Sequence, residues 1–248
     1  MKSSLFLLLI FLTPLAQARV FNINKENFAA YFLGTTGASS IGTSAVDDES
    51  SQTVTFDDKT NYNFTGEFGL VYSRPWLSLR FGFEIQRPWV LETVANNGTD
   101  DLYTAKVDLI GYIPKVTAEI NLQGTNTYRS FLSVSAGTAN LTMKNDYTLT
   151  AAGSTAFAGV TDHTVEAKGT APLLAASLGY EGFMTDTTTI LVEFGYRQLN
   201  FDNMKYSKDV TTFSGAKTSG SEVLKVDGEK REFDFTGGFI SIGFRFYM

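Results

Sequence analysis

The stretch Ile240-Ser241-Ile242-Gly243-Phe244-Arg245-Phe246-Tyr247-Met248 decides the fold, because its side chains alternate in character at every position. In an extended strand, successive side chains point to opposite faces. One face would carry only apolar side chains, and these are Ile240, Ile242, Phe244, Phe246 and Met248. The other face holds Arg245 among small residues and one tyrosine. This pattern predicts a strand with lipid on one side and a polar interior on the other, and we interpret it as the closing strand of a β-barrel.

The opposite end of the chain has the features of an export signal. Lys2 precedes an apolar run from Leu5 to Leu12, and Ala16-Gln17-Ala18 is a small-x-small cleavage site. The run is too short for a membrane-spanning helix, which needs about 20 apolar residues. We therefore expect residues 1–18 to be a cleaved signal peptide and residues 19–248 to be the mature chain.

Composition narrows the class of the mature chain. No later apolar run is long enough for a spanning helix, so a membrane could be crossed only by a closed barrel of strands. The chain has no Cys, which excludes a disulfide scaffold, and its 21 Phe and 11 Tyr against 5 Pro suit a sheet. Its net charge is −6 without a basic cluster, so nucleic acid is not an expected partner.

Alternation of apolar and polar residues predicts eight antiparallel strands in an up-and-down barrel. They are expected at about 27–41, 61–74, 77–90, 102–122, 127–143, 164–183, 188–201 and 230–248. Pro114 lies inside the fourth strand, where we expect a bulge or bend because proline lacks the N–H that a ladder needs.

The connections are expected to alternate between short and long. Short turns are predicted at Pro75, Gly124 and Asp186, and long loops near 42–60, 95–101, 144–163 and 202–229. This asymmetry is typical of outer-membrane barrels, with four long extracellular loops and both termini on the periplasmic side. A ten-stranded barrel remains open if the third or fourth loop hides a hairpin, as Val223–Val226 could indicate. A soluble periplasmic barrel is a third alternative.

With these features the chain resembles the small bacterial outer-membrane β-barrel proteins, the class of the OmpA transmembrane domain, OmpX and OmpW. The resemblance covers the mature chain as architecture. Its most specific part is the last strand, which resembles the signal read by the barrel-assembly machinery, with Phe244, Phe246 and Met248 in phase. The usual signal ends in Phe or Trp, whereas this chain ends in Met. The resemblance implies a monomer surrounded by outer-membrane lipid, with a structural or surface-interaction role or a small channel for ions or small or apolar solutes.

The interior of the predicted barrel holds several charged residues. The inward set includes Glu67, Arg80, Glu84, Glu119, Glu193, Arg197 and Arg245. An eight-stranded barrel is just wide enough to be filled by side chains, so a plug of paired Glu and Arg is the first expectation and a narrow polar passage the second. If Pro75-Trp76 is a two-residue turn, Glu67 lies opposite Glu84 and two carboxylates repel. Either Arg197 or Arg80 then reaches between them, or one carboxyl takes up a proton.

Catalytic and metal sites are weakly indicated. The only histidine, His163, lies near Ser154, Asp162 and Glu166, but their spacing fits no known motif, and a solvated loop histidine is the expected reading. Loop carboxylates are expected to be hydrated and not to bind Ca²⁺, and these are Asp47, Asp48, Glu49, Asp57 and Asp58. We therefore expect no enzyme, no cofactor and no metal, with a lipid-modifying enzyme as a distant alternative. The sequence does not identify an extracellular ligand.

Overall fold

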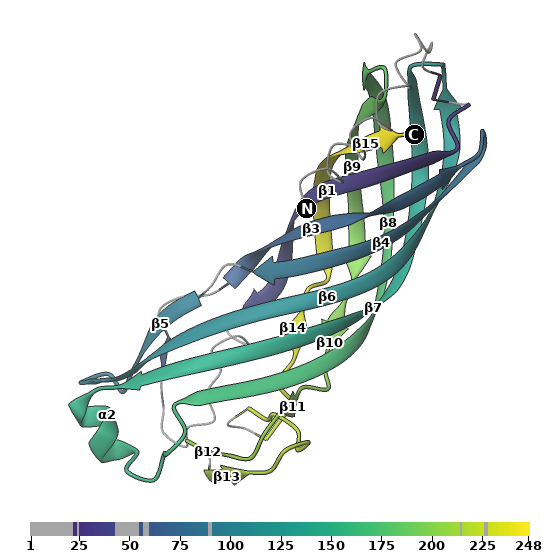
Figure 1. Ribbon diagram of the computed structural model, residues 1–248. Helices are drawn as coiled ribbons and strands as arrows, with labels where there is room; N and C mark the ends of the chain where they lie inside the picture. The colour runs from purple at the N-terminus through teal and green to yellow at the C-terminus, as the bar shows by residue number, and fades with distance from the viewer. Residues whose placement is uncertain are drawn as a thin grey trace, which may run out of the picture.

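In a computed structural model, eight antiparallel strands close into a single ring (Figure 1). The structure describes residues 22–23, 25–42, 55–56, 60–88, 91–213, 215–225 and 228–248. The ring strands, in chain order, are β1 (Phe28–Gly42), β3 (Thr60–Ser73), β4 (Leu77–Pro88), β6 (Asp101–Gly124), β7 (Tyr128–Leu149), β8 (Thr164–Thr185), β9 (Thr188–Gln198) and β15 (Gly237–Tyr247). Each pairs with its neighbours in the chain, and β15 returns to pair with β1. The predicted up-and-down barrel of eight strands is confirmed.

The short turns lie at the same end of the barrel as the start of β1 and the C-terminus (Figure 1). Arg74 N donates to Leu77 O at 2.7 Å, which closes the two-residue Pro75-Trp76 turn. Thr125 N donates to Tyr128 O at 2.8 Å and closes the next one. These turns fix the register of the strands that they join.

Three of the strands are about twice as long as the others. β6 has 24 residues, and β7 and β8 have 22 each, whereas β9 and β15 have 11. A tilted strand needs only about 9–11 residues to cross a membrane. The strands β6, β7 and β8 therefore continue past the barrel (Figure 1). Together with several short elements they form an extension, which we define as residues 91–109, 139–171 and 199–236.

The short elements of the extension lie outside the ring. They are β2 (Thr55–Phe56), which pairs with β5 (Leu91–Asn96); α2 (Ala151–Ala156); the pair β10 (Asn200–Phe201) and β14 (Phe233–Asp234); β11 (Lys205–Tyr206), which pairs with β8; and the hairpin β12 (Val210–Thr212) and β13 (Gly215–Lys217). Among the described residues, no helix is long and apolar enough to cross a membrane.

The ten-stranded alternative is wrong, although the fourth loop does contain a hairpin. That hairpin, β12–β13, forms a separate two-stranded sheet. The last ring strand also begins at Gly237 and not near residue 230, because residues 231–235 pack into the extension, where Phe233 and Phe235 are fully buried. At Pro114 no bulge forms, since Phe83 pairs with Pro114 and the register with β7 is the same at Tyr112 and Lys115.

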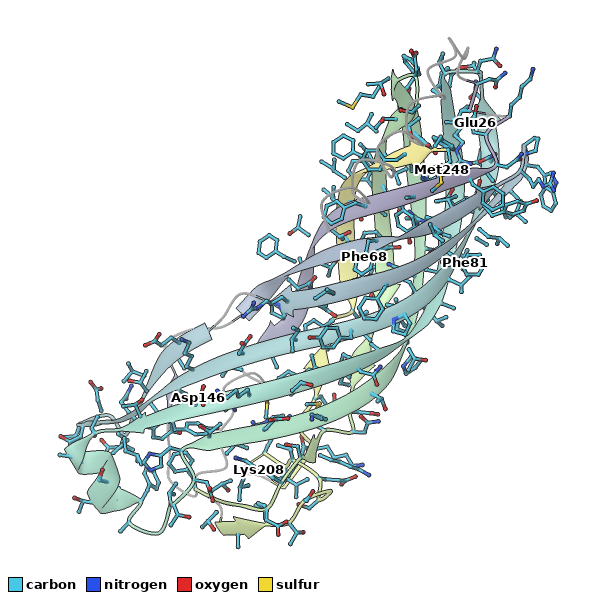
Figure 2. All side chains as sticks on the ribbon, viewed as in Figure 1. Glu26, Phe68, Phe81, Asp146, Lys208 and Met248 are labelled. Carbon is cyan, nitrogen blue, oxygen red and sulfur yellow. The ribbon has the colours of Figure 1, made fainter. Side chains whose placement is uncertain are left out.

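The outer face of the ring is a belt of exposed apolar side chains. Phe68 and Phe81 are 50% and 54% exposed and project from this surface (Figure 2). The belt also includes Phe32, Leu70, Val116, Ile120, Val134, Leu174, Leu178, Phe194, Ile242 and Phe246. An apolar surface of this extent around a closed ring of strands is stable only in lipid. The chain is thus an integral β-barrel of the bacterial outer membrane.

Beyond this belt, the two faces of the long strands exchange their polarity. Within the membrane section of β6, Val116 and Ile120 face outward and Glu119 faces the lumen. Past Ile110, Lys106 and Asp108 face outward instead, and the inward residues form an apolar core. That core contains Leu109, Val107, Leu141, Met143, Val165, Phe201, Phe233 and Phe235. The extension is therefore built as a sheet in water, with its own buried core. The sequence analysis did not identify this exchange.

Candidate functional site

The lumen of the membrane section holds a network of ten buried charges. The structure places all seven lumen residues predicted from the sequence there: Glu67, Arg80, Glu84, Glu119, Glu193, Arg197 and Arg245. Sequence reasoning missed Lys115, Arg129 and Glu181, which belong to the same network. Among the described residues, five carboxylates thus meet five cations. Burying a charge is costly unless it is paired, and this balance satisfies that condition.

The group nearer the short turns contains three carboxylates and three guanidinium groups. Arg129 binds Glu181 at 2.8 Å and Glu119 at 3.0 Å. Arg245 binds the same two carboxylates, at 2.9 Å from Glu181. Arg80 joins Glu119 at 3.0 Å to Glu193 at 2.7 Å. Glu119 is therefore the hub of this group, because it is the one carboxylate in contact with all three arginines.

The second group lies nearer the extension and is also neutral. Lys115 Nζ binds Glu67 at 2.8 Å and Glu84 at 2.6 Å. Arg197 binds Glu84 at 3.4 Å and donates to the backbone oxygen of Phe235 at 3.1 Å. Tyr31 donates its hydroxyl to Glu67 at 2.5 Å.

Glu67 does lie opposite Glu84, and of the two predicted partners Arg197 binds Glu84, but neither arginine bridges the pair. The shared cation is the ammonium of Lys115, while Arg80 binds Glu119 and Glu193 instead. Lys115 reaches the pair from β6, where it lies opposite Gly82. The sequence pattern could have shown that Lys115 faces the lumen, because Lys115 and Glu119 are an even number of residues apart in one strand and therefore lie on the same face. Glu181 likewise has the parity of the inward Ser177 and Gly179.

Apolar residues pack against the network. Ile23, Phe131 and Leu191 belong to one buried cluster, in which Ile23 N donates to Asn126 O of a short turn at 3.1 Å and the Phe131 ring lies 5.4 Å from the Arg129 guanidinium group. The core of the extension begins beyond the second charge group. Between the two charge groups is a cavity of ≈20 Å³, lined by Glu67, Arg80, Glu84, Lys115, Glu193 and Arg197 together with hydroxyl groups. A space of that size holds about one water molecule.

The residues considered for catalysis are not assembled into a site. His163 is exposed, and its backbone oxygen accepts from Tyr147 N at 2.8 Å. Asp162 accepts from Thr211 N at 2.7 Å, and Glu166 binds Lys168 at 3.0 Å. These carboxylates therefore bind within the extension, and among the described residues no hydrogen bond orients the imidazole as a base would require.

Two further predictions concern metal binding by the loops and the assembly signal in the last strand. Within the described ranges no group of His, Cys, Asp or Glu is arranged to hold a metal ion. The acidic residues 47–49, 57 and 58, and the signal segment 1–18, lie outside the described residues. In the last strand, Phe246 and Met248 are 49% and 72% exposed and Phe244 is half-buried, all on the lipid face.

Comparisons with known proteins give similar folds. No protein-family model matches the chain, and no curated protein matches it. Among solved structures, Neisserial surface protein A has 11% identity and a TM-score of 0.45, covering 89% of this chain and 97% of its own. OprG from Pseudomonas aeruginosa has 14% identity and a TM-score of 0.46, covering 93% and 99%. The outer membrane protease OmpT from Escherichia coli has 10% identity and a TM-score of 0.38, covering 93% and 99%. At these identities and scores the likenesses carry no argument about function.

Proposed function

We propose that this protein is a sealed outer-membrane barrel with a structural or surface-interaction role, which it performs through its extracellular extension. The observation that carries the proposal is the filled lumen, where ten paired charges leave a cavity of ≈20 Å³ and apolar clusters pack against them. A solute would have to break several buried ion pairs to pass. Each such break leaves an uncompensated charge in a low-dielectric interior, which is strongly unfavourable.

The extension supports the second half of the proposal. Its sheet has a buried core in which Tyr103 stacks on Phe213 at 4.7 Å, and Phe157 lies 4.8 Å from Phe213. A loop held in this way keeps its outer side chains in fixed positions, and fixed positions favour binding because less ordering is needed. In this proposal residues 1–18 are a removed export signal, the barrel-assembly machinery reads the last strand, and the protein is a monomer without enzymatic activity.

A narrow channel is the second candidate. Serine and threonine hydroxyls line one side of the cavity, and these include Thr35, Ser133, Ser135, Ser177 and Ser241. Rearrangement of Lys115 and Arg197 could open a polar path along them for ions or small solutes.

Single-channel recording in a planar lipid bilayer separates the two candidates. Folding is first established by a heat-sensitive shift in gel mobility. A sealed barrel gives no conductance steps above the bare bilayer. Reproducible steps that change in Glu84→Gln, but not in the exposed control Glu222→Gln, would refute the sealed barrel and establish a channel lined by the network.

A further inference from the structure

An array of hydrogen-bond donors lies on the outer face of the extension, where the apolar belt ends. β11 pairs with β8 so that Lys205 lies directly opposite Lys168 (Figure 1). On the other side of β8, Lys168 lies opposite Thr142 of β7. One rung across three strands thus presents a hydroxyl and two ammonium groups, and both lysines are exposed.

The next row of paired residues toward the membrane also carries polar side chains. Asn140 lies opposite Thr170, and Asn203 Oδ1 accepts the backbone N–H of Thr170 at 3.1 Å. That bond uses the amide oxygen of Asn203 and leaves its Nδ2 as a donor. The six polar side chains surround a groove of ≈400 Å³, whose lining contains no carboxylate.

The position of this groove relative to the membrane follows from the residues that flank it along β8. Toward the membrane, Pro172 and Leu174 are exposed, and Leu174 belongs to the apolar belt. Away from the membrane, Glu166 lies opposite Lys144. The groove therefore occupies the depth at which the headgroups of the outer lipid leaflet meet the protein.

The facing lysines need an explanation, because like charges directly opposite each other in a ladder are destabilising. Glu166 binds Lys168 at 3.0 Å, and this hydrogen bond lowers the pKa of Glu166, so its carboxylate is charged at neutral pH. Lys205 forms a β-bridge with Glu222, whose carboxylate binds Lys230 at 2.8 Å. For Lys205 itself, no ion pair is found within the described part of the chain.

We infer that this groove binds the phosphate group of an anionic lipid headgroup from the outer leaflet. Ammonium, amide and hydroxyl donors converge from Lys168, Lys205, Asn203 and Thr170, and phosphate oxygens are strong acceptors for such groups. The lipid chains would lie along the apolar belt beside Leu174. This inference does not depend on whether the lumen is sealed.

Binding of lipid A to the folded full-length protein in detergent, measured by native mass spectrometry, tests the inference. Diphosphorylated lipid A should bind more tightly than its dephosphorylated form. Lys168→Gln and Lys205→Gln should each weaken binding about fivefold and the double variant about thirtyfold. Lys106→Gln is the matched control, since it removes an exposed lysine from the same outer face, and its affinity should stay within about twofold.

Three outcomes would overturn the inference. An unchanged affinity in the double variant excludes the groove, and an equal loss in Lys106→Gln shows only general charge attraction. Competition by inorganic phosphate at the same concentration as the lipid would show that the groove binds free anions, and would exclude a lipid as its specific ligand. If the double variant does not fold, as judged by the heat-sensitive gel shift, the variant Lys168→Arg with Lys205→Arg is used instead. It keeps both positive charges, so it should still bind lipid A, and a loss of binding would overturn the inference.

Discussion

Glu67 and Glu84 face each other directly across β3 and β4, and a single ammonium group, that of Lys115, binds both carboxylates. The arrangement needs space on the intervening strand, and Gly82 provides it. A Cβ on Gly82 would lie 2.7 Å from Glu67 Oε1 and would also clash with the Tyr31 hydroxyl. The pairing of charges in the lumen therefore depends on a residue that has no side chain.

Gly82→Ala should destabilise the barrel by about 1–3 kcal/mol, because the added methyl group displaces Glu67 or Tyr31 from their contacts. Unfolding in urea, followed by the heat-sensitive gel shift, measures the change. Gly66→Ala is the control, since its added Cβ has no neighbour closer than 3.8 Å. Equal stability of the two variants would show that the lumen adapts to the extra volume.

Lys115→Met should cost about 3–5 kcal/mol, because it leaves two facing carboxylates buried without their shared cation. Adding Glu67→Gln should recover part of this loss, since only Glu84 then keeps a charge and Arg197 still binds it. A double-mutant cycle in urea measures the coupling. Additive losses would mean that Lys115 and Glu67 do not interact in the folded barrel.

Glu119→Gln should destabilise the barrel by about 3–5 kcal/mol, since it leaves three buried guanidinium groups with two carboxylates. Glu222→Gln supplies the control, because its exposed ion pair with Lys230 is screened by solvent and its loss should leave the unfolding midpoint nearly unchanged. The two midpoints of urea unfolding are compared. A loss in Glu119→Gln no larger than in the control would refute its role as the hub.

Phe235→Ala should loosen the extension and leave the membrane section folded. The side chain is fully buried and lies 5.8 Å from Phe201 in an edge-to-face contact, so its removal should cost about 3–5 kcal/mol in that core. Protease added to intact cells should cut within residues 199–236 faster than in the wild type, with the gel shift retained. Phe81→Ala, on the lipid face, should leave the cleavage rate unchanged.

Lys205→Glu should leave the stability of β11 nearly unchanged, because it replaces the like-charge pair with Lys168 by an opposite pair and also places a carboxylate opposite Glu222. The same change should abolish phosphate-dependent binding of lipid A. Hydrogen exchange at Ser207, whose backbone N–H donates to Glu166 O of β8 at 2.9 Å, reports the first effect. Faster exchange would show that Lys205 stabilises the strand in a way that charge alone does not explain.

The strand count and the three short turns, at Pro75, Gly124 and Asp186, followed from the sequence because both depend on local patterns. Alternation along Leu77–Pro88 placed Arg80 and Glu84 inside and Phe81 outside, and the Pro75-Trp76 turn set the register that brings Glu67 opposite Glu84. The partner of that pair could not be read in the same way. Lys115 lies on a third strand, and its contact with both carboxylates depends on ring closure and on the space above Gly82.

By itself the sequence determined that strands alternate between a lipid face and a polar face, since side-chain direction in a strand has a period of two residues. It also determined that charged residues on one face must share the narrow lumen. Only the tertiary structure decided where along β6, β7 and β8 the two faces exchange roles. The reason is that Leu109 and Met143 become core only when residues 199–236 fold across them and exclude water.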